Sequence, residues 1–139
     1  MRAAPQLTLV GLAMAHLALS ACGPSAQRLA AEETIRTASR GVAEVHASGG
    51  ESPAVTDALG ETDRWLADAE DAVSRWGDRT RSLAYETMAP CLARSLRDLR
   101  DALLADGRTV PADLESAEAA AAAIDDHPCP RRARESGAP

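Results

Sequence analysis

The sequence predicts an all-α protein, a small up-and-down bundle of three or four helices. Its composition favours helices, since Ala, Leu, Arg and Glu are abundant. Strands are disfavoured, because β-branched and aromatic residues are few. Apolar residues also recur at alternating spacings of three and four, in stretches separated by Gly, Pro and Ser. The expected bundle domain spans residues 28–127.

The first predicted helix runs from near Ser25 to about His46. Its apolar side is expected to contain five residues at helical spacing: Leu29, Ile35, Ala38, Val42 and Val45. The segment from Ala47 to Pro53 includes Ser48-Gly49-Gly50, so its composition predicts a loop.

The second predicted helix has the most regular pattern in the chain and ends at Gly77. Seven residues at spacings of three and four lie along one face of this helix: Val55, Ala58, Thr62, Trp65, Ala69, Ala72 and Trp76. Trp65 and Trp76 are eleven residues apart, so at 100° per residue they return to within ~20° of each other. Large Trp alternating with small Ala suits interdigitation with a neighbouring helix, and we favour core positions for both. A ligand or partner surface at Trp65 and Trp76 is the alternative.

The third predicted helix runs from about Arg79 to a C-terminal cap at Gly107. Its apolar residues keep the same mixed spacing: Tyr85, Ala89, Leu92, Leu96, Leu99 and Leu103. Pro90 lies inside this pattern and has no amide hydrogen, so the helix either bends there or starts anew. We favour one long, bent helix.

A fourth helix is predicted by Thr109-Val110-Pro111-Ala112-Asp113, which supplies a cap, an early Pro and an acid in the first turn. The helix is expected to keep Ile124 on its apolar side and to stop before Pro128. The Ala-rich stretch 119–123 is expected to allow close approach to a neighbouring helix. Residues 128–139, rich in Pro and Arg, form an expected disordered tail. The tail contains Arg131, Arg132 and Arg134, which we interpret as solvated. Contact with anionic lipid or an acidic envelope polymer is the alternative.

The start of the chain has the three parts of an export signal: Arg2, an apolar run from Leu7 to Leu19, and small residues before Cys22. The run is too short to span a ~30 Å hydrocarbon core comfortably. Its end, Leu19-Ser20-Ala21-Cys22, resembles the lipobox of bacterial lipoproteins, in which an aliphatic residue and two small residues precede an obligatory Cys. The resemblance implies removal of residues 1–21 and a diacylglyceryl group on the Cys22 thiol.

This resemblance implies a cell-envelope protein that is held on a membrane by lipid and faces away from the cytoplasm, with residues 22–27 as lipidated Cys and tether. Two or more acyl chains, at ~0.8 kcal/mol per buried methylene, give a stable anchor. An Asp after the Cys tends to retain Gram-negative lipoproteins at the inner membrane, whereas this chain has Gly23. The outer membrane is therefore expected if the cell has two. The alternative is a plain secretion signal with an incidental Cys22.

With Cys22 assigned to lipid, the remaining pair, Cys91 and Cys129, predicts a disulfide in an oxidising compartment. If the third and fourth helices form an antiparallel hairpin, the two cysteines lie ~22 and ~27 Å from its turn, at 1.5 Å per residue. The bond is then expected to staple the C-terminal hairpin at its open end. A redox-active pair is disfavoured because the chain has no Cys-x-x-Cys motif.

Other chemistries find little support in the residues. The candidate ligands for zinc or copper, by residue type, are His46, Cys91, His127 and Cys129. No pair of them has the short spacing of structural zinc sites. The sequence has neither a Cys-x-x-Cys-His haem motif nor a glycine-rich phosphate loop. We expect no cofactor and no metal. The formal charge of −6 argues against nucleic acid as a partner.

The function favoured by the sequence is that of a non-enzymatic, lipid-anchored envelope lipoprotein, whose helical surface meets another protein or assembly. The alternative is a bundle that binds a small ligand or metal, around Trp65 and Trp76 or through the His and Cys residues. An enzyme is a third hypothesis, which would require His46 or His127 beside a carboxylate in a pocket.

Overall fold

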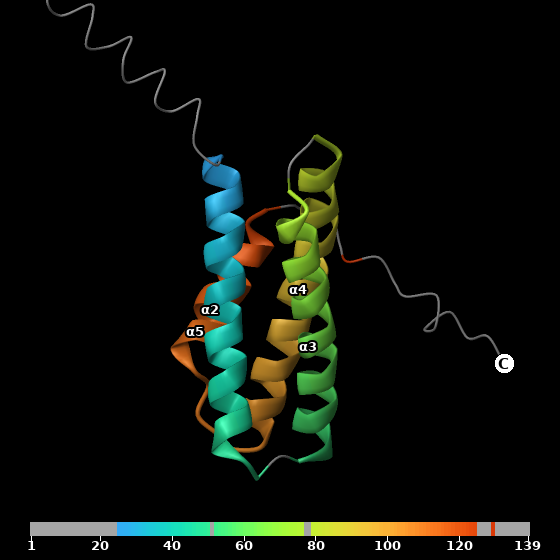
Figure 1. Cartoon of the computed structure of the whole chain (residues 1–139). Coiled ribbons are helices and arrows are strands. Elements are labelled where there is room, and N and C mark those ends of the chain that lie inside the picture. Colours follow the sequence, from blue (N-terminus) through green and yellow to red (C-terminus); the bar gives the residue numbers. More distant parts are fainter. Residues whose placement is uncertain (1–24, 51, 77–78, 125–128, 130–139) are drawn as a thin grey trace, which may run out of the picture.

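The computed structural model describes residues 25–50, 52–76, 79–124 and Cys129, with residues 79–83 described by their backbone alone. All regular structure within these ranges is helical: α2 (Ala26–Ser48), α3 (Pro53–Ser74), α4 (Arg79–Ala105) and α5 (Ala112–Ala122). Successive helices run in opposite directions (Figure 1). The predicted all-α, up-and-down bundle is confirmed. The predicted export signal, Cys22 and the predicted tail 128–139, apart from Cys129, lie outside the described residues.

The four helices form a closed ring around one core. Helix α3 packs against α2 and α4, and α5 packs against α4 and α2 (Figure 1). The core is built mostly from aliphatic side chains, and its largest fully buried members include Leu59, Leu92, Leu96, Leu99, Leu103 and Leu114. Burying one such side chain contributes roughly 1.5–3 kcal/mol, so this set is the main source of stability.

The helix ends are capped as their sequences require. The Ser25 hydroxyl accepts a hydrogen bond from the Arg28 amide, and Ser52 accepts one from the Val55 amide, each at the start of its helix. Helix α4 ends at Ala105, and Gly107 follows it with a φ of 70°, which suits a residue without a Cβ. The Arg108 amide donates to the Leu103 carbonyl at 2.9 Å, which completes a Schellman motif and confirms the predicted cap.

Pro90 lies within an uninterrupted helix. Helix α4 continues through it from Arg79 to Ala105, so the helix does not start anew at Pro90 and the prediction of one long helix is confirmed. Because Pro has no amide hydrogen, the Glu86 carbonyl one turn earlier loses its usual helical donor.

Helix α5 is shorter than predicted. Its N-cap is Pro111, without a side-chain cap, whereas Thr109 was expected to cap it. It ends at Ala122, and Ile124 is 37% exposed instead of lying on the core. An Ala-rich sequence has uniformly high helix propensity and no stop signal, so the pattern could not locate this end.

Helices α2 and α5 approach each other closely at Gly41, a position that no sequence pattern indicated. A Cβ atom at Gly41 would lie 2.9 Å from the backbone nitrogen of Leu114. Within 119–123 only Ala121 is buried. Leu29, predicted on the apolar side, is 51% exposed, which corrects that prediction. It lies nine residues from the fully buried Ala38, and nine steps of 100° amount to half a turn.

Candidate functional site

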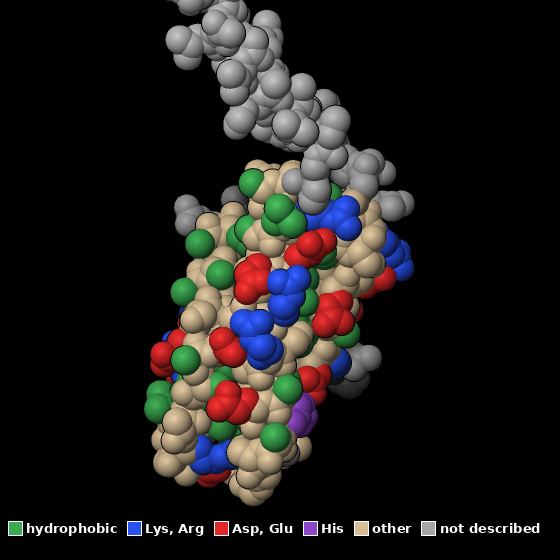
Figure 2. Space-filling model, turned by 60° about the vertical axis from the view of Figure 1, so that its left-hand side comes forward, with side chains coloured by type: hydrophobic (Ala, Val, Ile, Leu, Met, Phe, Trp, Pro, Cys, Tyr) green, Lys and Arg blue, Asp and Glu red, His purple; other side chains and the backbone are tan. Residues whose placement is uncertain are grey.

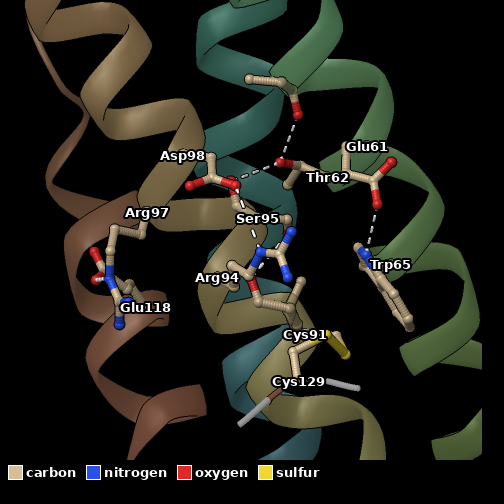
Figure 3. Close-up of polar contacts among 12 residues, drawn as sticks. Glu61, Thr62, Trp65, Cys91, Arg94, Ser95, Arg97, Asp98, Glu118 and Cys129 are labelled. Carbon is tan, nitrogen blue, oxygen red and sulfur yellow. Dashed lines mark hydrogen bonds and ion pairs between the residues drawn. A yellow bond between two sulfur atoms is a disulfide. The ribbon is translucent and has the colours of Figure 1, made fainter. Parts of the chain in front are cut away.

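Trp65 and Trp76 are both half-buried and pack against the core, so each has an apolar face inside and a remainder at the surface. The Trp65 indole Nε1 donates to Glu61 Oε1 at 2.9 Å, which fixes the orientation of the ring (Figure 3). The Trp76 ring lies against Tyr85 of α4, with ring centroids 6.1 Å apart and planes tilted by 46°. Both side chains therefore pack against the core as favoured, but neither is fully buried. The alternative, a ligand or partner surface, stays a hypothesis.

These two side chains belong to the junction between α3 and α4. Thr62 marks this junction, because its hydroxyl lies 2.8 Å from the Ala58 carbonyl on α3 and 3.2 Å from the Ser95 carbonyl on α4 (Figure 3). Met88 and Ala102 each lie seven residues from Ser95 and therefore within ~20° of it around α4. Partly buried apolar residues concentrate here, and we call them the α3–α4 seam: Ala58, Trp65, Trp76, Met88 and Ala102.

The seam has properties that suit a binding surface. Trp and Met are enriched at protein interfaces, where a partner covers the apolar area that is still exposed. A ring that is already held in one orientation also loses little conformational freedom on binding. Trp65 meets this condition through its hydrogen bond to Glu61.

The predicted disulfide is confirmed. Cys91 and Cys129 are bonded, with their Cα atoms 4.7 Å apart, and the bond ties the chain beyond α5 back onto α4 (Figure 3). Cys91 is buried and lies four residues before Ser95, on the side of α4 that meets α3. The staple therefore lies close to the α3–α4 seam.

The hypothetical metal set does not come together in the described residues. The disulfide consumes the thiols of Cys91 and Cys129, and a thiolate is the form that binds metal. His46 lies elsewhere, between α2 and α3, with its Nε2 3.1 Å from Asp63 Oδ2. His127 lies outside the described residues. Over the described ranges, no three His, Cys, Asp or Glu residues group as a metal ion would require.

A buried carboxylate between α4 and α5 was not foreseen from the sequence. Glu118 is 9% exposed and accepts a hydrogen bond from Arg97 Nε at 3.1 Å (Figure 3). It accepts a second one from Arg100 Nη1 at 2.6 Å. Its signal is one acid within the stretch 117–123, which is otherwise all Ala, but the two arginines come from another helix and cannot be paired with it by local spacing. The contact joins α4 to α5 and keeps the charge of Glu118 paired.

Tyr85 is a polar group enclosed by the core. Burial raises the pKa of its phenol, and the nearby Thr34 hydroxyl partly opposes that rise. Thr34 donates its hydrogen to the Ala30 carbonyl at 2.9 Å. Among the described residues, the phenol oxygen has no partner with good hydrogen-bond geometry.

The face formed by α2 and α5 is charged, in contrast to the seam. Basic and acidic side chains alternate along it (Figure 2). They include the exposed Arg36–Glu33 pair within α2 and the Arg40–Asp113 pair between α2 and α5, in which Asp113 is partly buried. Exposed pairs of this kind contribute about 0–1 kcal/mol each, and such a face favours solvation.

The described part of the chain is thus an all-α, disulfide-linked bundle with one partly exposed tryptophan seam. Comparison with protein-family models, curated proteins and solved structures finds no match for this chain. None of the helices in the described ranges is both long and apolar enough to cross a bilayer.

Proposed function

We propose that the protein is a lipid-anchored envelope lipoprotein that acts without catalysis, by presenting the α3–α4 seam to another envelope protein. The anchor is supported by Leu19-Ser20-Ala21-Cys22 at the end of an apolar run. The interaction is supported by one observation above all, the half-buried Trp65 whose ring is fixed by Glu61 beside a disulfide-tied segment.

The charges beside the seam indicate the chemistry of the partner. Asp57, Glu61 and Asp68 follow one another at spacings of four and seven along α3, next to the Trp65 side of the helix. Asp57 and Asp68 are exposed. A partner with an apolar pocket for Trp65 and Arg or Lys at its rim would match this arrangement in both shape and charge.

The anchor is tested by the intact mass of the protein isolated from its native membrane. Loss of residues 1–21 together with a mass increase from acyl groups on Cys22 is the expected result. The same spectrum reports the deficit of two hydrogens from the Cys91–Cys129 bond. A mature protein with an unmodified Cys22 thiol would overturn the anchor.

The interaction surface is tested by photo-crosslinking in intact cells. A benzophenone amino acid replaces Trp65 in one variant and the exposed Arg36, on the charged α2–α5 face, in the control. We expect one protein adduct of defined mass from position 65 and none from position 36. Equal adducts from both positions, or no protein adduct from position 65, would contradict the proposed surface.

A further inference from the structure

Two of the large apolar side chains that are exposed in the described residues lie at the same end of the bundle. These are Leu29, 51% exposed, and Ile124, 37% exposed. Gly41 of α2 touches Leu114 of α5, and the two helices are antiparallel. From that contact Leu29 lies twelve residues back and Ile124 ten residues on, which is about 18 and about 15 Å at 1.5 Å per residue. Leu29 and Ile124 therefore lie at nearly the same height.

Leu29 is a surface residue of α2 and not an uncovered part of the core. It points away from the bundle axis, half a turn from Ala38, and its neighbours Ala26 and Ala30 are also exposed. We call Ala26, Leu29 and Ala30 the α2 entry patch. In Figure 2 apolar side chains lie at the upper end of the face, where α2 begins, together with a basic one, and charged side chains become frequent below them. The partly buried Arg28–Glu32 pair lies beside the patch, and the exposed Glu33–Arg36 pair follows it along α2.

The length of the chain limits how far the entry patch can move from the anchor. Three peptide units separate Cys22 from Ser25, the cap of α2. Consecutive Cα atoms are 3.8 Å apart, so Ser25 can lie at most about 11 Å from the Cys22 Cα. If Cys22 carries lipid as proposed above, the entry patch is held at the membrane surface continuously.

We propose that the α2 entry patch and Ile124 contact the lipid bilayer, so that this end of the bundle rests in its interfacial region. The inference rests on the proposed lipidation of Cys22. A bilayer is favoured over a protein as the occupant because the short link gives the patch a high effective concentration of lipid at all times. Apolar side chains gain by entering the interface, whereas the charged α2–α5 face does not.

The opposite end of the bundle supplies a matched control. Leu104 is also a Leu on a helix surface and is 59% exposed, but it lies near the C-terminal end of α4. It is as apolar and as accessible as Leu29. The difference that the comparison uses is its greater distance from the anchor.

The test is photo-crosslinking of the lipidated, full-length mature protein in vesicles of phosphatidylethanolamine and phosphatidylglycerol. A benzophenone amino acid replaces Leu29 in one variant and Leu104 in the other, and adducts are identified by mass. Both sites are exposed, and the disulfide mass deficit with a helical circular dichroism spectrum verifies folding of each variant. We expect phospholipid adducts from the variant labelled at position 29 and none from the variant labelled at position 104.

Each outcome decides a separate point. Phospholipid adducts from neither position, or equally from both, would overturn the proposed contact even when the mass shows acyl groups on Cys22. Repeating the crosslinking in native membranes tests for a protein occupant, and a protein adduct from position 29 in place of lipid would also overturn it. An unmodified Cys22 would instead refute the proposed anchor, on which this inference depends.

Discussion

At the scale of single residues, Gly41 sets the distance between α2 and α5. A Cβ added there would lie 2.9 Å from both the backbone nitrogen and the Cδ2 of Leu114. Gly41→Ala gains about 1 kcal/mol of helix propensity, but overpacking against a backbone atom costs about 1–3 kcal/mol. We expect a net loss in the free energy of unfolding, measured by urea denaturation.

Gly60 is the control for Gly41, since it also lies inside a helix but has no atom within 4 Å of an added Cβ. Gly60→Ala should raise the free energy of unfolding by up to about 1 kcal/mol. If both substitutions were stabilising, α2 and α5 would not approach each other as closely as described.

Tyr85 offers a stabilising substitution. Its hydroxyl is buried without a well-aligned hydrogen-bond partner among the described residues, while its ring packs against Trp76. Leaving such a group unsatisfied costs about 1–3 kcal/mol. Tyr85→Phe keeps the ring and removes the hydroxyl, so the free energy of unfolding should rise by about 1 kcal/mol in urea denaturation. A loss of stability would mean that the hydroxyl has a partner, such as a buried water.

The raised pKa of Tyr85 also predicts alkaline sensitivity. The unfolded phenol ionises near its ordinary pKa of 10.0, whereas burial keeps the folded phenol neutral to higher pH. Between the unfolded and folded pKa values the unfolded state binds fewer protons, so stability falls as pH rises. Tyr85→Phe should remove this part of the loss, measured as the pH dependence of the urea midpoint from pH 8 upwards. Equal slopes in both proteins would contradict this role for Tyr85.

At the scale of elements, the Cys91–Cys129 bond fixes the chain beyond α5 onto α4. It closes a loop with a sequence separation of 38, worth about 4 kcal/mol in the chain-entropy model and commonly 2–4 in practice. The double variant Cys91→Ser, Cys129→Ser should lose about 2–4 kcal/mol of unfolding free energy by urea denaturation. Reduction of the unaltered protein should reproduce most of the loss. A loss of unfolding free energy below about 1 kcal/mol would show that the pairing of α4 and α5 does not depend on the disulfide.

The sequence predicted elements best where one pattern had one physical cause. The buried face of α3 was predicted correctly, since Val55, Thr62 and Ala69 repeat every seven residues and are all buried. The pattern did not predict how far residues at the margin of this face are buried. Trp65 lies at that margin, where it packs against the core and stays partly exposed. The salt bridges of Glu118 depend on which helix lies beside α5, so no local spacing could indicate them.

At the scale of the whole molecule, the anchor and the bundle have separate physical origins. The buried apolar residues of the core lie between Ala31 and Ala121, and α2 is capped by Ser25. Nothing in this core requires lipid on Cys22. The bundle domain is therefore expected to fold identically with or without its attachment, which allows the two properties to be tested independently.

Replacement of the lipidated residue tests that independence. Cys22→Ala removes the only thiol that the proposed modification can use, because Cys91 and Cys129 are bonded to each other. We expect the variant to leave the washed membrane fraction, since loss of the acyl chains removes ~0.8 kcal/mol per buried methylene. Its thermal unfolding midpoint should match that of the unaltered bundle. Cleavage can fail in such a variant and leave the apolar run attached, so a second protein beginning at Gly23 behind an ordinary secretion signal provides the control. Membrane retention of that second protein would show that contacts of the bundle itself hold it in place.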